Sequence, residues 1–345
     1  MKVVVACAGH AAPHAGWAAI DELADLLVHY LGGELISPRR APPSLAQRLL
    51  GKASTAWEPI DCAGGDMLIV VAHAPQDLSM IDAIAGCRRK FKRIVAWVTD
   101  SYFQAGFGRA TAEYDAITVT AHEDAAHPRS RYGIAVHQVY QGVDGLAWAP
   151  PPDALRAIDL IGFGRMPPSY HAHFSQRFHA ASSPHLYLHS PLGNVTGESV
   201  HLERGMLFKL LHRTKVSLAF HLYVEPQGQR PRAMMVTSRW QESLLAGCVV
   251  AGKRPVSRMG EDMLCWPDAT MELADDPQDA GDELQHLLAF DDELHALRQR
   301  NVREVLLRHD WRHRIVELCG HFGLPLPLAL AEDLQRVRAL AGRFV

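Results

Sequence analysis

The sequence lacks the features that mark several well-known protein classes. Its six cysteines, at positions 7, 62, 87, 248, 265 and 319, are scattered and form no Cys-x-x-Cys pair, which argues against a disulfide scaffold and a structural zinc site. No apolar run approaches the ~18–20 residues that a membrane helix needs. The apolar start, Val3–Ala8, is shorter than the ~7–15 residues of a signal-peptide core. Together these absences favour a cytoplasmic protein with reduced thiols.

An excess of positive charge is also missing. Lys and Arg total 35 against 38 Asp and Glu, for a formal net charge of −3, whereas a generic nucleic-acid binder is strongly basic. Hydrophobic residues make up 48% and charged residues 21% of the 345 positions, which is ordinary globular composition. The length suggests two domains or one large one.

Three nucleotide and hydrolase motifs are absent as well. The glycines between Gly9 and Gly16 do not form Gly-x-Gly-x-x-Gly, which argues against a nicotinamide dehydrogenase. Neither a P-loop nor a Gly-x-Ser-x-Gly elbow occurs in the chain, which argues against a P-loop NTPase and leaves no nucleophile elbow.

Short apolar runs alternate with segments of helical periodicity along most of the chain. Strands are expected at 3–7, 67–72, 94–98, 116–120, 136–140, 158–163, 185–189, 215–221 and 248–251. Helices are expected at 17–30, 77–87, 169–180, 200–213 and 238–246, followed by a helical tail from residue 282. Apolar strands that alternate with helices predict parallel sheets covered on both faces.

Pro150-Pro151-Pro152 is the clearest interruption of this pattern, because tandem prolines continue neither a helix nor a central strand. We therefore expect domains at 1–150 and 151–322, and a C-terminal helix at 323–345 that packs back on the first domain. Ligands of open parallel sheets bind at the carboxyl ends of the strands. A cleft between two such sheets is thus the expected site.

The segment 237–250 has the residues that a nucleotide diphosphate needs. Thr237 and Ser238 precede a helix whose N-terminal N–H groups suit a phosphate, and Arg239 adds a forked cation. Glu242, one turn later, could accept hydrogen bonds from a ribose diol. The alternative is an ordinary capping box that only stabilises the helix.

The spacing Arg239-x-x-Glu242-x-x-x-x-Gly247 resembles that of GT-B glycosyltransferases, in particular the family-4-like and spore-maturation-protein-like (CgeB-type) group. Further similar stretches occur in the expected order over most of the chain, at 92–102, 113–119, 141–144, 215–220 and 308–314. The resemblance implies an α/β protein of GT-B architecture, with two Rossmann-like domains whose parallel sheets face across a cleft, and a helical C-terminal tail.

The resemblance also implies an activity. The protein would be a bacterial glycosyltransferase of the hexosyltransferase type, which moves a sugar from a nucleotide-sugar donor to a hydroxyl of a glycan, lipid-linked or protein-linked acceptor. It would retain the anomeric configuration and require no metal or other cofactor. No nucleic-acid partner is implied, and the absence of a transmembrane segment leaves room for a peripheral membrane contact.

Donor-binding roles carry over residue by residue. Glu242 would hold the ribose, and Thr237, Ser238 and Arg239 the diphosphate. Arg165 follows an expected strand where the family often has a phosphate-binding arginine. Two departures stand out: Met234 occupies the position of the first glutamate of the family's Glu-x7-Glu pair, and the usual second phosphate lysine is missing. The cations expected to replace that lysine are His171, Lys209 and Arg239 itself.

The acceptor side is expected at the first domain. Gly9 would let the backbone approach a ligand, and Asp144 would line the cleft. Asp100, at the end of a strand, would position or deprotonate the acceptor hydroxyl, or simply cap the next helix. His10 and His122 are rival bases, and His10 is the one we favour beside Asp100.

Alternatives of other classes remain open. His309 and His313 stand at i and i+4 but lack a third zinc ligand, and His171 and His173 lack a carboxylate or thiolate partner, so we expect no metal site. A non-catalytic protein that binds a nucleotide sugar would explain Met234. A GT-B epimerase would interconvert donors without an acceptor.

Overall fold

The computed structural model describes residues 1–51, 54–190, 192, 196–221, 223–225 and 233–344. The chain forms two compact units. The first comprises Met1–Gln141, Thr196–Glu198 and Ile315–Leu330, and the second comprises Gly142–Val195, Ser199–Arg314 and Ala331–Val345. The segment Pro150–Pro152 lies inside the second unit. The domain ends expected at 150 and 322 stay predictions.

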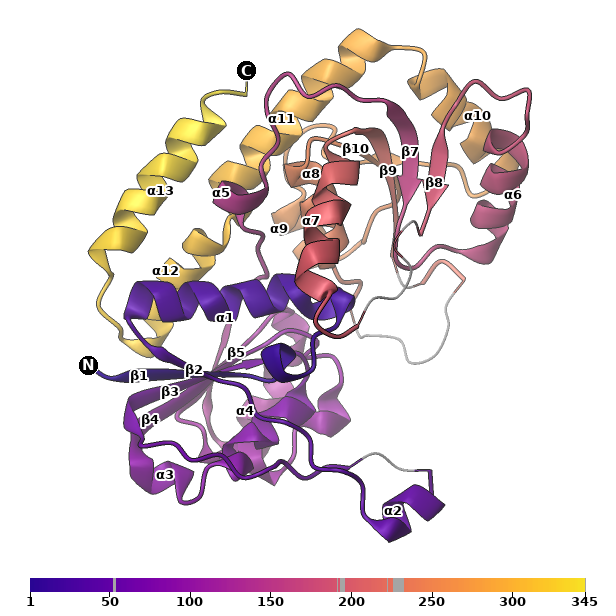
Figure 1. Cartoon of the computed structure of the whole chain (residues 1–345). Coiled ribbons are helices and arrows are strands. Elements are labelled where there is room, and N and C mark those ends of the chain that lie inside the picture. Colours follow the sequence, from indigo (N-terminus) through magenta and orange to yellow (C-terminus); the bar gives the residue numbers. More distant parts are fainter. Residues whose placement is uncertain (52–53, 191, 193–195, 222, 226–232, 345) are drawn as a thin grey trace. The chain divides into compact units, whose positions relative to one another are not determined.

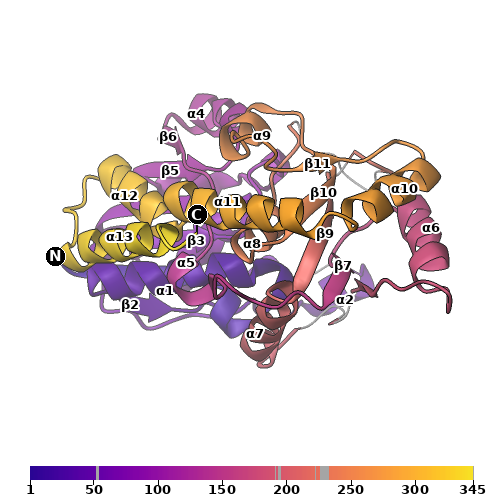
Figure 2. The same cartoon turned by 90° about the horizontal axis from the view of Figure 1, so that it is seen from above.

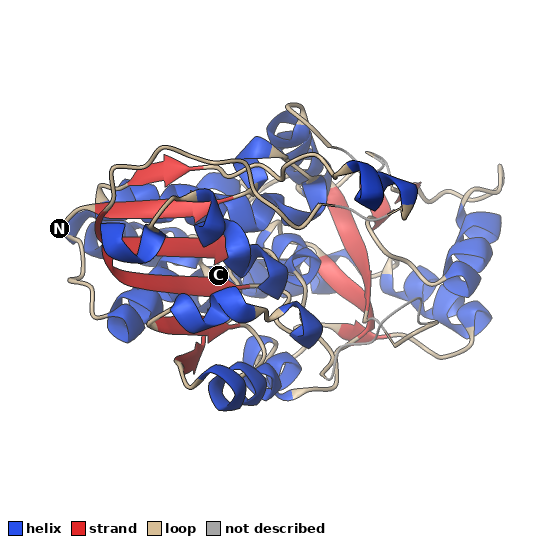
Figure 3. Ribbon diagram, turned by 90° about the horizontal axis from the view of Figure 1, so that it is seen from below, coloured by secondary structure: helices blue, strands red, loops and turns tan. Residues whose placement is uncertain are grey.

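The first unit is built on a parallel sheet in the order β2-β1-β3-β4-β5-β6. Its central strands are buried along most of their length because both faces are covered. Figure 3 shows the strands side by side. Their bounds are β1 Val3–Cys7, β2 Glu34–Ile36, β3 Gly65–Ala72, β4 Phe91–Val98, β5 Ala116–Val119 and β6 Ala135–Gln138.

Helices cover both faces of this first sheet (Figure 1). The long helix α1 packs against β1, β2 and β3 and ends at Gly32, whose φ of 61° is the left-handed conformation common at helix ends. On the opposite face lie α3 and α4. The bounds are α1 Ala18–Leu31, α2 Leu45–Leu49, α3 Cys87–Lys90 and α4 Ala126–Tyr132, with 3-10 turns at Gly9–Ala11, Ala15–Trp17, Pro75–Ala83, Gln104–Gly106, Arg109–Glu113 and His122–Asp124.

The second unit is built on another parallel sheet, in the order β11-β10-β9-β7-β8. From β7 the chain goes to β8 on one side and then crosses back to β9 on the other side. The carboxyl ends of β7 and β9 therefore flank the point where the strand order reverses. The bounds are β7 Ile158–Gly162, β8 Tyr187–His189, β9 Thr214–Phe220, β10 Val249–Lys253 and β11 Met271–Glu272.

The helices of the second unit pack on its sheet and on one another. Figure 2 shows α6 beside α10 and the long α11 near α8, and both pairs are in contact. Aromatic and aliphatic side chains of α6, α10 and strands β7–β10 share one apolar core. The bounds are α5 Gly145–Trp148, α6 Pro168–Phe178, α7 Val200–Leu211, α8 Ser238–Leu245, α9 Arg258–Met263, α10 Pro277–Leu287, α11 Asp291–His309, α12 Trp311–Phe322 and α13 Leu328–Ala341. Helices α12 and α13 each contribute residues to both units.

The structure confirms the predicted α/β class with two Rossmann-like parallel sheets and a helical C-terminal tail, and it corrects two details. The helix expected at 77–87 is a 3-10 helix over Pro75–Ala83 that ends where Ile84 takes an extended backbone, followed by the short α3. The edge strands β2 and β11 are additions, because three and two residues are too few to give a periodic signal.

None of the helices in the described part of the chain is long and apolar enough to cross a membrane.

Candidate functional site

The expected donor-binding residues Arg165 and Arg239 meet at the carboxyl edge of the second sheet. Gly162 ends β7 and leads through Gly164 to Arg165, and Arg239 lies in the first turn of α8, the helix that follows β9. These positions flank the reversal of strand order between β7 and β9. Such a switch point is where open α/β sheets bind their ligands.

Arg239 lies directly against the loop that follows β7. Its Nη1 donates to the carbonyl oxygen of Arg165 at 2.5 Å, and its guanidinium carbon lies 5.5 Å from the ring centre of Phe163. Gly164 has φ of 66°, and a Cβ there would approach Nη2 of Arg239 to 2.4 Å. Glycine thus provides both the left-handed backbone and the room for the guanidinium.

The two guanidinium groups are close enough to influence one another. Burial, and then the positive charge of Arg165, lower the pKa of Arg239 to about 10, whereas Glu242 acts in the opposite direction. A bound anion would offset this repulsion. The half-buried Arg239 can offer a phosphate a forked set of donors.

Thr237 and Ser238 leave the start of α8 without a side-chain cap. Thr237 occupies the N-cap position with φ of −81° and ψ of 167°, but its side chain makes no capping hydrogen bond. It is exposed, and Ser238 is half-buried. The ordinary capping box is therefore not formed, and the first N–H groups of this helix keep a positive end that suits an anion.

Glu242 is buried and forms an ion pair. Its side chain is 6% exposed, and its Oε1 accepts a hydrogen bond from Nη1 of Arg204 at 2.7 Å. Arg204, equally buried, lies 5.7 Å from the ring centre of Trp148 and 5.2 Å from that of Phe208. The expected ribose role of Glu242 stays a prediction, since at least one of its oxygens is already engaged.

The two other expected cations lie elsewhere in the second unit. His171, in the first turn of α6, stacks on His189 at 3.6 Å between ring centres, and its Nδ1 lies 3.3 Å from the hydroxyl of Tyr187. Lys209 is exposed in the last turn of α7. Within the described residues, no hydrogen bond, ion pair or ring contact joins either one to Arg165 or Arg239.

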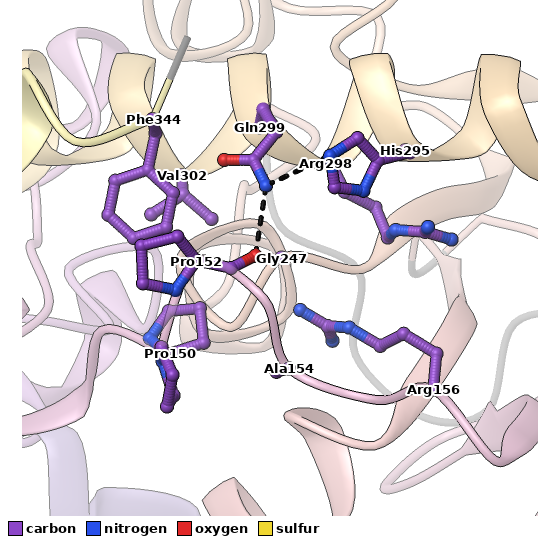
Figure 4. Close-up of a pocket in the computed structure, with 11 residues that line it drawn as sticks. Pro150, Pro152, Ala154, Arg156, Gly247, His295, Arg298, Gln299, Val302 and Phe344 are labelled. Atoms are coloured by element: carbon purple, nitrogen blue, oxygen red, sulfur yellow. Dashed lines mark hydrogen bonds between the residues drawn. The ribbon is translucent and has the colours of Figure 1, made fainter.

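A small pocket of the second unit lies at the amino ends of its strands, opposite their carboxyl ends. Its walls include Arg156, just before β7, Gly247, just before β10, and the proline segment from 150 to 152. Figure 4 shows Gln299 donating to the carbonyl of Pro152, at 3.0 Å. This pocket lies at the amino ends of the strands and is therefore separate from the expected donor site.

Asp144 makes several contacts within the second unit. It caps α5 through hydrogen bonds from the amides of Leu146 and Ala147, and it accepts from Nη1 of Arg312 at 2.8 Å. The next amide, Gly145, donates to the buried Asp310 at 2.8 Å. The two stretches that resemble family motifs, 141–144 and 308–314, are thereby joined, and the cleft role of Asp144 stays a prediction.

The two histidines of the tail each lie against a backbone carbonyl. Nε2 of His309 lies 2.7 Å from the carbonyl of Met263, and Nε2 of His313 lies 3.1 Å from that of Leu306. Burial lowers the pKa of His309 to about 3. Among the described residues, the group with metal-ligand spacing is Cys7, Asp21 and His73, whose ligand atoms lie within 4.8 Å of one another.

The acceptor-side residues expected in the first unit follow neighbouring strands. Gly9 and His10 come after β1, and Asp100 follows β4. The amide of Asp100 donates to the carbonyl of His73, which follows β3, at 2.9 Å. Nε2 of His10 lies 2.8 Å from Oδ1 of Asp25, a hydrogen bond that raises the pKa of His10.

Sequence reasoning missed three residues at these edges: Asp21, His73 and Arg204. His73 follows the buried run 67–72 just as His10 follows 3–7, so the same rule could have found it. Asp21 and Arg204 lie in amphipathic helices where a charged residue usually faces solvent, and no sequence signal distinguishes them.

Residues 171–320 match the family described as glycosyl transferase-like. None of the curated protein sequences is significantly similar to the chain. Among solved structures, HepE of Anabaena, determined in complex with UDP-glucose, is similar at 10% identity with a TM-score of 0.54, over 94% of this chain and 99% of that chain.

Two other solved structures are similar with lower TM-scores. S. aureus TarM, determined with fondaparinux, alpha-GlcNAc-glycerol and UDP, has a TM-score of 0.45 at 9% identity, over 74% of this chain and 54% of that one. AviGT4, a glycosyltransferase involved in avilamycin A biosynthesis, has a TM-score of 0.44 at 15% identity, over 92% and 96%. The likeness to HepE shows that the chain has the GT-B fold, as the resemblance predicted, and its residues 171–320 match the glycosyl transferase-like family.

Proposed function

We propose that the protein is a glycosyltransferase that moves a sugar from a nucleotide-activated donor to a hydroxyl acceptor. The observation that carries the proposal is the pair Arg165 and Arg239 at the switch point of the second sheet, beside the uncapped start of α8. The glycosyl transferase-like match supports it, since that region contains Arg239 and Glu242. HepE, of the same fold, was determined with UDP-glucose.

In the proposed reaction, residues of the second unit stabilise the leaving group. When the bond between the sugar and the diphosphate breaks, negative charge develops on the phosphate oxygen. Arg165, Arg239 and the first N–H groups of α8 would stabilise that charge. This donor set can stabilise the leaving diphosphate without a metal ion, and we propose that transfer is metal-independent.

The finer points of the proposal rest on the resemblance. It implies a hexose donor, a glycan or lipid-linked acceptor, action in a bacterial cytoplasm, and retention of the anomeric configuration. It also assigns Asp100 or His10 to the acceptor hydroxyl and Glu242 to the ribose. Met234, which stands for the family's first glutamate, is half-buried and packs on the turn at 256–257 through its sulfur and carbonyl.

Thermal stabilisation by nucleotide sugars tests the donor site. The panel would be UDP, UDP-glucose, UDP-N-acetylglucosamine and GDP-mannose, with and without Mg²⁺, on wild type, Arg239→Gln and the control Arg258→Gln. A bound ligand raises the melting temperature by mass action. We expect at least one ligand to stabilise wild type and Arg258→Gln but not Arg239→Gln, with no need for Mg²⁺.

Two outcomes would change the assignment. If no ligand stabilises wild type, or if Arg239→Gln keeps the full shift, the donor site is not at Arg239. If a donor binds but is never consumed with any acceptor, the non-catalytic binding protein becomes the better description.

A further inference from the structure

Asp21 is a buried carboxylate that is held in place from three sides. It lies in the first turn of α1 and is 2% exposed. Its Oδ1 accepts from Sγ of Cys7 at 3.3 Å and from Nε2 of His73 at 2.9 Å. The backbone of Gly9 presses against the same carboxyl group, since a Cβ on Gly9 would come within 1.8 Å of Oδ1. The carboxylate therefore has one fixed position.

His73 is oriented as firmly as its partner. It follows the last residue of β3 directly, and its ring stacks on Trp17 with 4.8 Å between ring centres and 4° between planes. Because Nε2 faces the carboxylate, it carries the proton, and Nδ1 keeps a lone pair. Among the described residues Nδ1 has no hydrogen-bond partner, and it is not one of the enclosed polar atoms. The basic nitrogen of this imidazole is therefore open to a ligand.

The position of His73 is the one expected for a residue that meets substrate. Strand β3 lies between β1 and β4 in the sheet, so His73 sits between the ends that carry Gly9 and Asp100. The amide of Asp100 bonds to its carbonyl. Ligands of open parallel sheets bind outside these carboxyl ends.

We infer that His73 accepts the proton of the sugar-acceptor hydroxyl, with Asp21 as the positioning residue that orients its ring. The inference rests on the proposed glycosyltransferase function. Nδ1 takes the proton while the hydroxyl oxygen forms its bond to the anomeric carbon. The bond from that carbon to the diphosphate breaks, and its electron pair leaves with the nucleoside diphosphate. The imidazolium that results is stabilised by the Asp21 carboxylate, as in other carboxylate–histidine pairs.

His10, the base expected from the sequence, has a weaker partner. The carboxylate beside it, Asp25, is 53% exposed, whereas the Asp21 side chain is 2% exposed. Water screens the first pair, and the low dielectric around the second strengthens its hydrogen bond. The buried Asp21 therefore fixes the orientation of the His73 ring more firmly than the exposed Asp25 fixes that of His10.

Among the described residues, the other ionisable groups near His73 are Cys7 on β1, His10 just after β1, Asp25 on α1 and Asp100 after β4. Burial, and then the charge of Asp21, raise the pKa of Cys7 well above its ordinary value. The thiol thus stays neutral over the pH range in which a histidine titrates.

The role of His73 has a consequence for the configuration of the product. A base beside the acceptor hydroxyl assists direct displacement at the anomeric carbon, which inverts its configuration. This consequence opposes the retention that the resemblance implies, and the product anomer distinguishes the two.

Donor hydrolysis tests the inference without a known acceptor, because water can take the acceptor's place. The probes are UDP-α-glucose, UDP-α-N-acetylglucosamine and GDP-α-mannose, each with wild type, His73→Asn, Asp21→Asn and the control His29→Asn. His29 is an exposed histidine two turns further along α1. Nucleotide release gives kcat and KM between pH 5 and 9. Proton NMR identifies the sugar anomer that forms first.

We expect His73→Asn to lower kcat by roughly 10²-fold or more, the usual contribution of a general base, with KM little changed. Asp21→Asn should give a smaller loss and move the acidic limb of the kcat–pH profile, which a merely structural residue would not do. His29→Asn should match wild type. From the α-linked glucose donor the first anomer should be β-glucose. Thermal melting of each variant shows whether it is folded, and if Asp21→Asn is unfolded, His73→Gln replaces it.

The inference is overturned if folded His73→Asn keeps the wild-type kcat, if α-glucose forms first, or if wild type releases no nucleotide from any donor. UDP binding, measured in parallel, distinguishes failure of the role of His73 from failure of the proposed glycosyltransferase function. Wild type that binds UDP and turns over normally without His73 contradicts only the role of His73. Wild type that does not bind UDP contradicts the donor site.

Discussion

Asp21 in the first unit and Glu242 in the second are both buried carboxylates near the carboxyl ends of their strands, and their partners differ in chemistry. Asp21 in the first unit is bonded by a thiol and an imidazole. Glu242 in the second unit is bonded by the guanidinium of Arg204, which lies between two aromatic rings. An imidazole can gain and lose a proton near neutral pH, whereas a guanidinium cannot.

The difference fits the two proposed roles, proton transfer at the first edge and anion binding at the second. The opposite charges of Glu242 and Arg204 compensate one another. Arg165 and Arg239 are the arginines beside the switch point. The pair of Asp21 and His73 has a spare lone pair on Nδ1. The two sheets share the order of their first five strands, but they carry different side chains at their carboxyl ends.

The largest loss of stability is expected when Arg204, the permanently charged partner of Glu242, is removed. Arg204→Ala leaves Glu242 buried without its cation, which typically costs about 3–5 kcal/mol. Calorimetric unfolding should show a large fall in the transition of the second unit. Arg213→Ala, at an exposed arginine just beyond the same helix, should change little. Equal effects of the two substitutions would mean that the Arg204 pair is not a buried one.

A smaller loss of stability is expected when the carboxylate of Asp21, in the first unit, is crowded by a new side chain. The new Cβ of Gly9→Ala would come within 1.8 Å of Oδ1 of Asp21 and must displace it, at a cost of about 1–3 kcal/mol. Gly205→Ala is the matched control, because a Cβ there meets nothing within 4 Å, and we expect it to stabilise α7 slightly. Urea unfolding of both variants measures the contrast. A Gly9→Ala protein as stable as wild type would show that Asp21 is free to move.

The smallest effect concerns Asp25, an exposed carboxylate one turn after Asp21 on the same helix. Its hydrogen bond raises the folded-state pKa of His10. The stability it adds is therefore fully present below the unfolded pKa, about 6.5, and is lost as pH rises through the higher folded value. The amount should stay under about 1 kcal/mol because Asp25 is solvent-screened.

The change in melting temperature between pH 5.5 and pH 8.5 measures this contribution. Asp25→Asn should remove the part due to His10, and Asp25→Glu should restore some of it. A pH dependence that is identical in wild type and Asp25→Asn would contradict the assignment.

Most of the fold could be predicted from the sequence, because buried parallel strands appear as apolar runs and the helices between them are periodic. The run 67–72 became β3, and the segment 238–246 became α8. The strands β2 and β11 could not be predicted, because their place depends on pairing with a neighbour rather than on their own pattern.

The site could be predicted only in part, because its geometry depends on contacts between distant segments. Arg239 and Gly247 carried the likeness that pointed to α8. The approach of Arg239 to Gly164, 75 residues earlier in the chain, has no local signature. The pairing of Glu242 with Arg204 could not be predicted, since helical spacing does not say what lies opposite a side chain. The ribose role of Glu242 stays a prediction.

Calorimetric titration with UDP, uridine and inorganic pyrophosphate tests most directly whether Arg239 binds the diphosphate of a nucleotide donor. Charge-assisted hydrogen bonds contribute about 1.5–3 kcal/mol each. We therefore predict that Arg239→Gln weakens the binding of UDP and pyrophosphate by roughly 10- to 100-fold and leaves uridine unaffected. Equal binding of UDP and uridine to wild type, or equal loss of all three ligands in Arg239→Gln, would contradict the account.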